Sequence, residues 1–181
     1  MKKQSDSDFG IIIWVILLIG TTGCALHVQV QKSLVAEDHL LPQLNMKTPV
    51  AIVALPHNLT GKVNFCKKGL GPMTLVYADL TDYAVQSMVD IFTRNNVQIM
   101  SGAEKALTIS IIESSCIQEF NAMKYVVDIN VAAGDKPAKQ FSGYQRLWSG
   151  RALSFTVTAA VLNAVLEMFK DEEIRHYLES S

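Results

Sequence analysis

The sequence predicts a two-layer α/β sandwich, in which a mostly antiparallel sheet of about five or six strands carries two helices on one face. Three observations support this fold. Short runs with strand-like alternation of apolar and polar residues recur along the chain, two helical segments interrupt them, and the first helix has one apolar and one polar face. An amphipathic helix of this kind is expected to lie across a sheet.

The strands are expected where the alternation or the β-rich composition occurs. "PVAIVAL" at 49–55 is a compact β-rich run, and "KVNFC" and "TLVYADL" follow as a hairpin around a turn at Gly69, Gly71 and Pro72. Later strands are expected at 97–100, 105–115, 124–133 and 139–149. The turn signal "AGDKP" makes the last two of these a second hairpin.

The first helix is expected to begin after Thr81, a favourable N-cap residue, and to end at Asn95 and Asn96. Its apolar residues fall on one arc, and its polar residues fall on the other. The apolar arc contains Ala84, Val85, Met88, Val89, Ile91 and Phe92.

The second helix, residues 151–170, is apolar on two faces, because Leu162, Leu166 and Phe169 lie nearly opposite its main apolar stripe. Three explanations are open: a second membrane span, a helix covered on both sides by its own chain, or a docking face for another subunit. A short terminal helix capped by Asp171 is expected to follow.

The N-terminal 23 residues have the features of a lipoprotein signal peptide. Lys2 and Lys3 precede an apolar run of about a dozen residues, which is signal-peptide length and too short to cross a bilayer alone. The segment "TTGC" ends at Cys24 and resembles a lipobox, so Cys24 is expected to carry a diacylglyceryl thioether. An uncleaved N-terminal anchor and an ordinary secreted or buried segment are the alternatives.

Lipidation of Cys24 would place the protein on a membrane, facing the periplasm. Ala25 follows the cysteine where an aspartate would signal retention at the inner membrane, so the outer membrane is the expected destination. Cleavage of 23 of the 181 residues leaves 158, enough for one domain with a core. We expect a lipidated tether at 24–47 and a single α/β domain at 48–181. Two forms of the tether are open: a segment that donates one edge strand, or a disordered spacer.

The two remaining cysteines, Cys66 and Cys116, form an even number in a compartment that oxidises thiols. A bridge between them would close a loop of about 50 residues and stabilise the fold by about 4 kcal/mol on the chain-entropy model. Two separate buried thiols are the alternative.

The sequence contains no recognisable catalytic set, so an enzyme is not expected. No nucleophile elbow, metalloprotease helix or phosphate-binding glycine loop occurs, and the four histidines are scattered along the chain. No metal or other cofactor is expected apart from the lipid on Cys24. The charge is nearly balanced, with 16 basic and 17 acidic residues, which argues against a nucleic-acid partner.

Residues that could contact a protein partner lie around the start of the second helix and on its second apolar face. Trp148 and Arg151 flank Gly150, and both residue types are common in interface hot spots. The alternative is a tryptophan that covers the core and an arginine that reaches solvent. The other partner-binding candidates are Leu162, Leu166 and Phe169.

The order of these segments resembles that of the YajG-like family of small bacterial lipoproteins. The closest local likeness is "RALSFTVTAAVLNAVLEMFK" followed by the tail of Asp171, Ile174, Tyr177 and Leu178. The resemblance implies an outer-membrane-anchored α/β domain without known chemistry, with a wider likeness to auxiliary lipoproteins of envelope transport and secretion machines. Cys66 and Cys116 are not part of that family pattern.

Taken together, the sequence suggests a non-catalytic periplasmic domain that serves as a structural or assembly subunit of an envelope protein complex. The alternative is a periplasmic carrier of a lipid or small apolar ligand. A carrier needs a cavity between sheet and helices, and small residues could leave one: Gly143, Ala159, Ala160 and Ala164.

Overall fold

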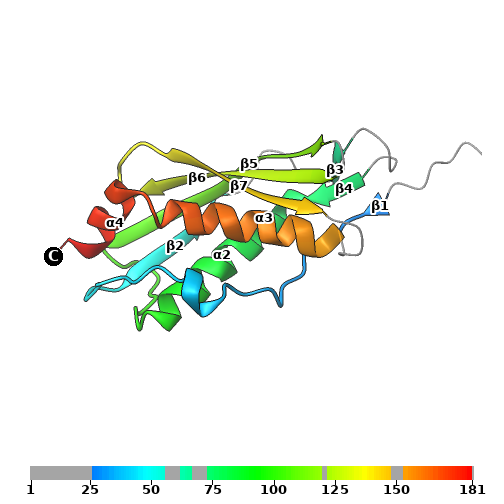
Figure 1. Ribbon diagram of the computed structural model, residues 1–181. Helices are drawn as coiled ribbons and strands as arrows, with labels where there is room; N and C mark the ends of the chain where they lie inside the picture. The colour runs from blue at the N-terminus through cyan, green and yellow to red at the C-terminus, as the bar shows by residue number, and fades with distance from the viewer. Residues whose placement is uncertain (1–25, 56–61, 67–72, 120–121, 148–152, 181) are drawn as a thin grey trace, which may run out of the picture.

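The computed structural model describes residues 26–55, 62–66, 73–119, 122–147 and 153–180, and it confirms the predicted α/β sandwich (Figure 1). The larger sheet has four strands in the order β2-β5-β6-β7. They span Val50–Ala54, Lys105–Gln118, Met123–Ala133 and Lys139–Leu147. The pairs β5–β6 and β6–β7 are antiparallel, and β2 is parallel to β5.

Three further strands form a separate small sheet, where the sequence had suggested one continuous sheet. β3 (Lys62–Cys66) and β4 (Met73–Val76) form the predicted hairpin, and β1 (Leu26–His27) adds to β4 in parallel. The strand expected at 97–100 is reduced to a single bridge between Val50 and Ile99.

Both long helices lie on the same face of the four-stranded sheet (Figure 1). α2 covers Tyr77–Arg94 and contacts β2 and β5, and α3 covers Leu153–Met168 and contacts β6 and β7. α2 begins five residues earlier than predicted, so Thr81 is not the N-cap. Its hydroxyl donates to Tyr77 O inside the helix, at 3.1 Å. The extra turn is stabilised by burial of Tyr77 and Leu80, which outweighs the capping preference.

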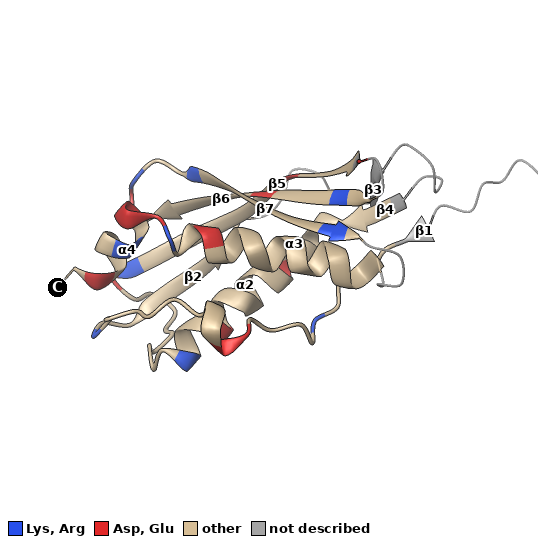
Figure 2. Ribbon diagram, viewed as in Figure 1, with Lys and Arg blue, Asp and Glu red and all other residues tan. Residues whose placement is uncertain are grey.

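The short helix α4 (Glu172–Glu179) has the predicted cap, because the Asp171 carboxylate accepts from the backbone N–H groups of Glu173 and Ile174. Lys139 of β7 also binds this carboxylate, at 3.0 Å. Figure 2 shows acidic and basic residues side by side at this end of the molecule. The cluster fixes α4 against the β6–β7 hairpin.

The second apolar face of α3 is covered by the chain itself. Leu162, Leu166 and Phe169 are only 7%, 8% and 1% exposed, and the Phe92 and Phe169 rings meet edge to face at 5.4 Å. These three candidate partner residues are therefore core residues in this structure, and a partner could reach them only if their cover moved. Among the described residues, no single helix is long and apolar enough to cross a membrane; only α3 and α4 together pass that test, as a pair bent by 68°.

The N-terminal segment, residues 26–47, packs on the domain, although the sequence left open that it might be a disordered spacer. It contains β1 and a short 3-10 helix, Asp38–Leu40. Val28, Ala36 and Leu44 are buried in the same core as the helices. The segment is therefore part of the folded unit.

Candidate functional site: a groove beside the edge strand

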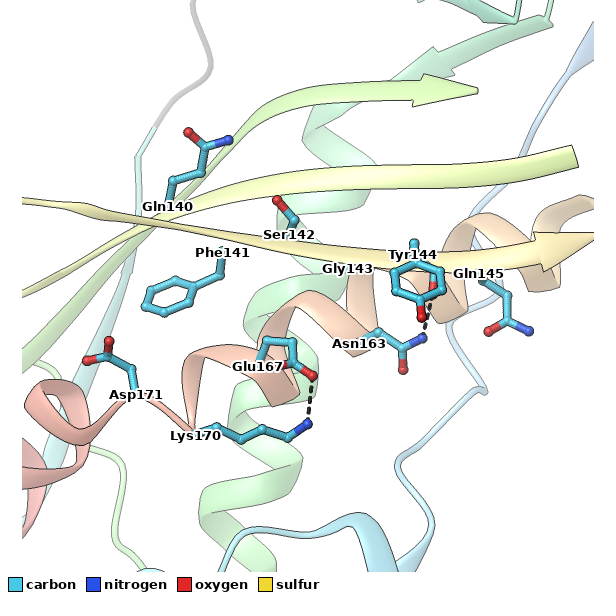
Figure 3. A pocket seen from close by; sticks show the side chains of 10 residues that line it. All are labelled: Gln140, Phe141, Ser142, Gly143, Tyr144, Gln145, Asn163, Glu167, Lys170 and Asp171. Carbon is cyan, nitrogen blue, oxygen red and sulfur yellow. Dashed lines mark hydrogen bonds and ion pairs between the residues drawn. The ribbon is translucent and has the colours of Figure 1, made fainter. Parts of the chain in front are cut away.

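A groove of about 730 Å³ runs between the outer strand of the sheet, β7, and the helices α3 and α4 (Figure 3). β7 forms one wall, and the last turns of α3 with the α3–α4 junction form the other. Its lining residues are Gln140, Phe141, Ser142, Gly143, Tyr144, Gln145, Asn163, Glu167, Lys170 and Asp171.

Gly143 explains why α3 lies so close to the edge of the sheet. A Cβ at this position would lie 2.1 Å from Ala160 O and 2.1 Å from Ala164 N, so the helix backbone rests directly on the glycine. Gly143, Ala160 and Ala164 thus allow close packing of strand and helix. At this contact the small residues leave no space for a ligand, and the alternative of a ligand carrier stays a prediction.

The outer edge of β7 carries backbone groups without strand partners. β7 pairs with β6 in unbroken register, and Asn163 Nδ2 donates to Tyr144 O at 2.8 Å, so the Tyr144 carbonyl points away from β6. In an antiparallel pair, outward-pointing residues alternate along the strand. Gln140 and Ser142 therefore also direct their N–H and C=O groups outward, and no other described residue bonds to these groups.

The charged residues at the groove are paired with one another. Glu167 binds Lys170 at 2.6 Å, and Lys139 binds Asp171 at 3.0 Å and Glu173 at 2.7 Å. The carboxylates of Glu173 and Asp171 hold the pKa of Lys139 above its usual value. Burial alone would raise the pKa of Asp171, but hydrogen bonds from Ile174 N and Lys139 outweigh it, so the pKa lies below its ordinary value. Lys139 and Asp171 therefore stay charged and paired at neutral pH.

The shifted tyrosines lie in the core. Burial raises the pKa of Tyr83 and of Tyr125 to about 12. Burial also raises the pKa of Tyr77, whose hydroxyl accepts from Ser114 N. In the part of the chain that the structure describes, no group of three or more His, Cys, Asp or Glu residues could hold a metal ion.

The structure places only some of the predicted site residues. Cys24, Trp148 and Arg151 lie outside the described residues. Cys116, in β5, is disulfide-bonded. Cys66 is the last residue of β3, which contacts β5, but its side chain lies outside the described part, so its pairing with Cys116 stays a prediction.

Sequence reasoning missed the groove. The alternation at 139–147 predicted the strand, and no local signal identified it as an outer strand. Gly143 in the middle of a strand was the one available clue, because a glycine there often marks a close approach of another backbone.

No protein-family model matches the sequence, and no curated protein matches it. The fold is similar to that of protein XCC0632 from Xanthomonas campestris, of the family DUF330, with a TM-score of 0.48 and 14% identity over 85% of this chain and 92% of that chain. An uncharacterized protein is similar with a TM-score of 0.41 and 10% identity, over 84% of this chain and 97% of that one. The likeness is thus to a small bacterial protein of DUF330, and membership in the YajG-like family is not confirmed.

Proposed function

We propose that this chain is an outer-membrane lipoprotein whose non-catalytic periplasmic domain is a structural or assembly subunit of an envelope protein complex. The single observation that carries the partner-binding role is the outer edge of β7, where the backbone groups of Gln140 and Ser142 face an open groove. The lipobox-like segment before Cys24 supports the anchor. The order of the segments and the Asp171-to-Leu178 tail support the finer proposal of a relationship to YajG-like lipoproteins.

The occupant that fits this groove best is an extended segment of a partner protein, added to β7 as a further strand. Such a segment would form up to four backbone hydrogen bonds with Gln140 and Ser142, whose N–H groups donate and whose C=O groups accept, the recognition mode known as β-augmentation. Its chemistry is that of a short uncharged peptide, because the charges at the rim are already paired. Asn163, bonded to Tyr144 O, would mark one end of the added segment.

A photo-crosslinking amino acid at Gln140 tests this proposal in intact cells. We expect a crosslinked species larger than the monomer, and mass spectrometry of its peptides should place the crosslink on an extended partner segment. The matched control is the same photo-crosslinker at Val53, which is 44% exposed on β2 at the other side of the sheet and should give no such species. A crosslink to a second copy of this chain would replace the proposed partner with self-pairing.

The variants Ser142→Pro and Ser142→Ala separate strand addition from ordinary surface contact. Proline removes the outward N–H and is tolerated on the outer side of an edge strand, whereas alanine keeps the N–H and removes only the hydroxyl, which bonds Asp128 at 2.5 Å. We expect Ser142→Pro to lose the crosslink and Ser142→Ala to keep it, with circular dichroism showing both folded. Equal crosslinking by both variants would exclude backbone pairing at β7.

The anchor is tested separately, by intact-mass analysis of the native protein with and without globomycin and for Cys24→Ser. The proposal requires a mass that lacks residues 1–23 and carries acyl chains on Cys24. An unprocessed chain without acyl groups would refute the lipoprotein assignment.

A further inference from the structure

The N-terminal segment, residues 26–47, is bonded to the domain along its whole length. Near its start, Val28 N donates to Thr74 O at 3.0 Å, which continues the contact of β1 with β4. Gln31 N then donates to the Thr158 hydroxyl of α3 at 2.8 Å. These bonds fix the beginning of the segment to both the small sheet and a core helix.

The middle and end of the segment are held by side chains of α2 and of its C-cap residue, Asn95. The Tyr83 hydroxyl donates to Leu34 O at 2.7 Å, and Arg94 Nη1 donates to Ala36 O at 2.8 Å. Leu44 N donates to Asn95 Oδ1 at 2.9 Å. Tyr83 and Ala36 are both buried, so this segment is an integrated part of the core.

Attachment along its whole length removes the spacer between anchor and domain. β1 begins at Leu26, two residues after Cys24. Two peptide units reach about 8 Å at most. The start of β1 must therefore stay within about 8 Å of the residue that carries the anchor.

We propose that the protein rests on its membrane with the end formed by β1, β3 and β4, and that a lipid bilayer surface is the partner of this end. The inference rests on the proposed anchor at Cys24. In Figure 1 this end lies at the tip of β5, and α4 with the β6–β7 turn lies at the opposite end. β5 has 14 residues, so the two ends are about 45 Å apart.

The resulting orientation directs the two ends of the sheet to different neighbours. Ile117, which is 50% exposed near the tip of β5, would lie by the lipid headgroups. Asp135, exposed in the turn after β6, would point away from the membrane. The groove beside β7 extends to the α3–α4 junction, so that end of it would point away from the membrane.

Collisional quenching in vesicles tests this orientation with the full native lipoprotein. A small fluorophore is placed at position 117 or 135, and the purified acylated protein is reconstituted in phosphatidylcholine vesicles that contain headgroup spin-labelled lipid. We expect strong quenching at 117 and little at 135. Equal quenching at the two positions would overturn the inference.

Two insertions of the same twelve-residue Gly/Ser linker provide matched variants. An insertion between residues 25 and 26 separates the anchor from the bonded segment and should abolish the quenching at 117. An insertion between Lys47, which is exposed, and Thr48 leaves the bonded segment in place and should retain the quenching. Loss of the quenching by the second insertion as well would show that residues 26–47 do not hold the domain at the membrane, which would also overturn the inference.

Intact-mass analysis of the same samples keeps this inference distinct from the proposed function. Absence of acyl chains on Cys24 would refute the proposed anchor itself. Acylated protein with the same quenching at 117 and 135 would refute only the orientation.

Discussion

Gly143→Ala is the substitution for which the structure gives the clearest expectation, because it opposes the usual rule. Replacing a glycine in a strand by alanine normally stabilises a protein by about 0.4–1 kcal/mol, since the unfolded chain loses conformational freedom. At Gly143 the new Cβ would lie 2.1 Å from Ala160 O and from Ala164 N. We therefore expect a destabilised protein.

The magnitude follows from the atoms that must move. Ordinary van der Waals contact begins at 3.4 Å, so α3 must move away from β7 by about 1.3 Å. Both obstructing atoms belong to the helix backbone and cannot rotate aside. Overpacking of this kind costs about 1–3 kcal/mol, and occasionally more. We expect about 3 kcal/mol, because α3 is buried against β6 and β7 along its length.

Equilibrium urea unfolding followed by circular dichroism measures this loss. Ser142→Ala, the neighbouring residue on the exposed side of β7, is the control and should change the free energy of unfolding far less. Adding Ala164→Gly to Gly143→Ala should not restore stability, because the clash is with backbone atoms. A neutral or stabilised Gly143→Ala protein would show that α3 does not rest on β7 as described.

Three further outcomes follow from the same structure. Asp171→Ala should destabilise the folded protein by about 1 kcal/mol through loss of the α4 cap, and Asp171→Asn should destabilise it by less. In the wild-type protein the stabilisation from this carboxyl should be lost as the pH drops through its lowered pKa, which thermal unfolding at several pH values would show. Tyr83→Phe should lower the free energy of unfolding by about 1 kcal/mol, because it removes the hydrogen bond to Leu34 O. Burial raises the pKa of Tyr83 to about 12, so the stabilisation from the neutral hydroxyl should be lost between about pH 10 and 12. An alkaline unfolding profile that is the same in the variant and the wild type would contradict this. Non-reducing peptide mapping should find Cys66 joined to Cys116, and reduction should lower the stability by about 4 kcal/mol, whereas a disulfide between Cys116 and any other residue would refute this pairing.

The sequence identified those elements whose signals are local. Alternation gave β5, β6 and β7, the glycines and proline gave the first hairpin, and Asp171 gave the start of α4. The sequence-based prediction was wrong at the start of α2, where burial determines the helix boundary. Thr81 is a favourable cap by type, but Tyr77 and Leu80 gain more by entering the core as an additional helical turn.

The candidate site could not be predicted in the same way, because it depends on which strand lies outermost. β6 and β7 have similar alternation, yet β7 is an outer strand and β6 is not. β7 stays outermost because β2 adds, in parallel, to β5 at the far side of the sheet. The double apolar character of α3 was recognised. That its cover comes from the chain itself, with Phe92 of α2 against Phe169, was one of the explanations that the composition left open.

The mixed strand order also has a kinetic consequence. β5, β6 and β7 follow one another along the chain and pair through short turns, whereas Val50 of β2 pairs with Lys105, across the whole β3–β4 hairpin and α2. Contacts between distant residues form late, because loop closure must precede them. We expect a three-stranded meander to form early in refolding and the parallel strand to join last, so that destabilising substitutions in β2 accelerate unfolding and leave the refolding rate almost unchanged.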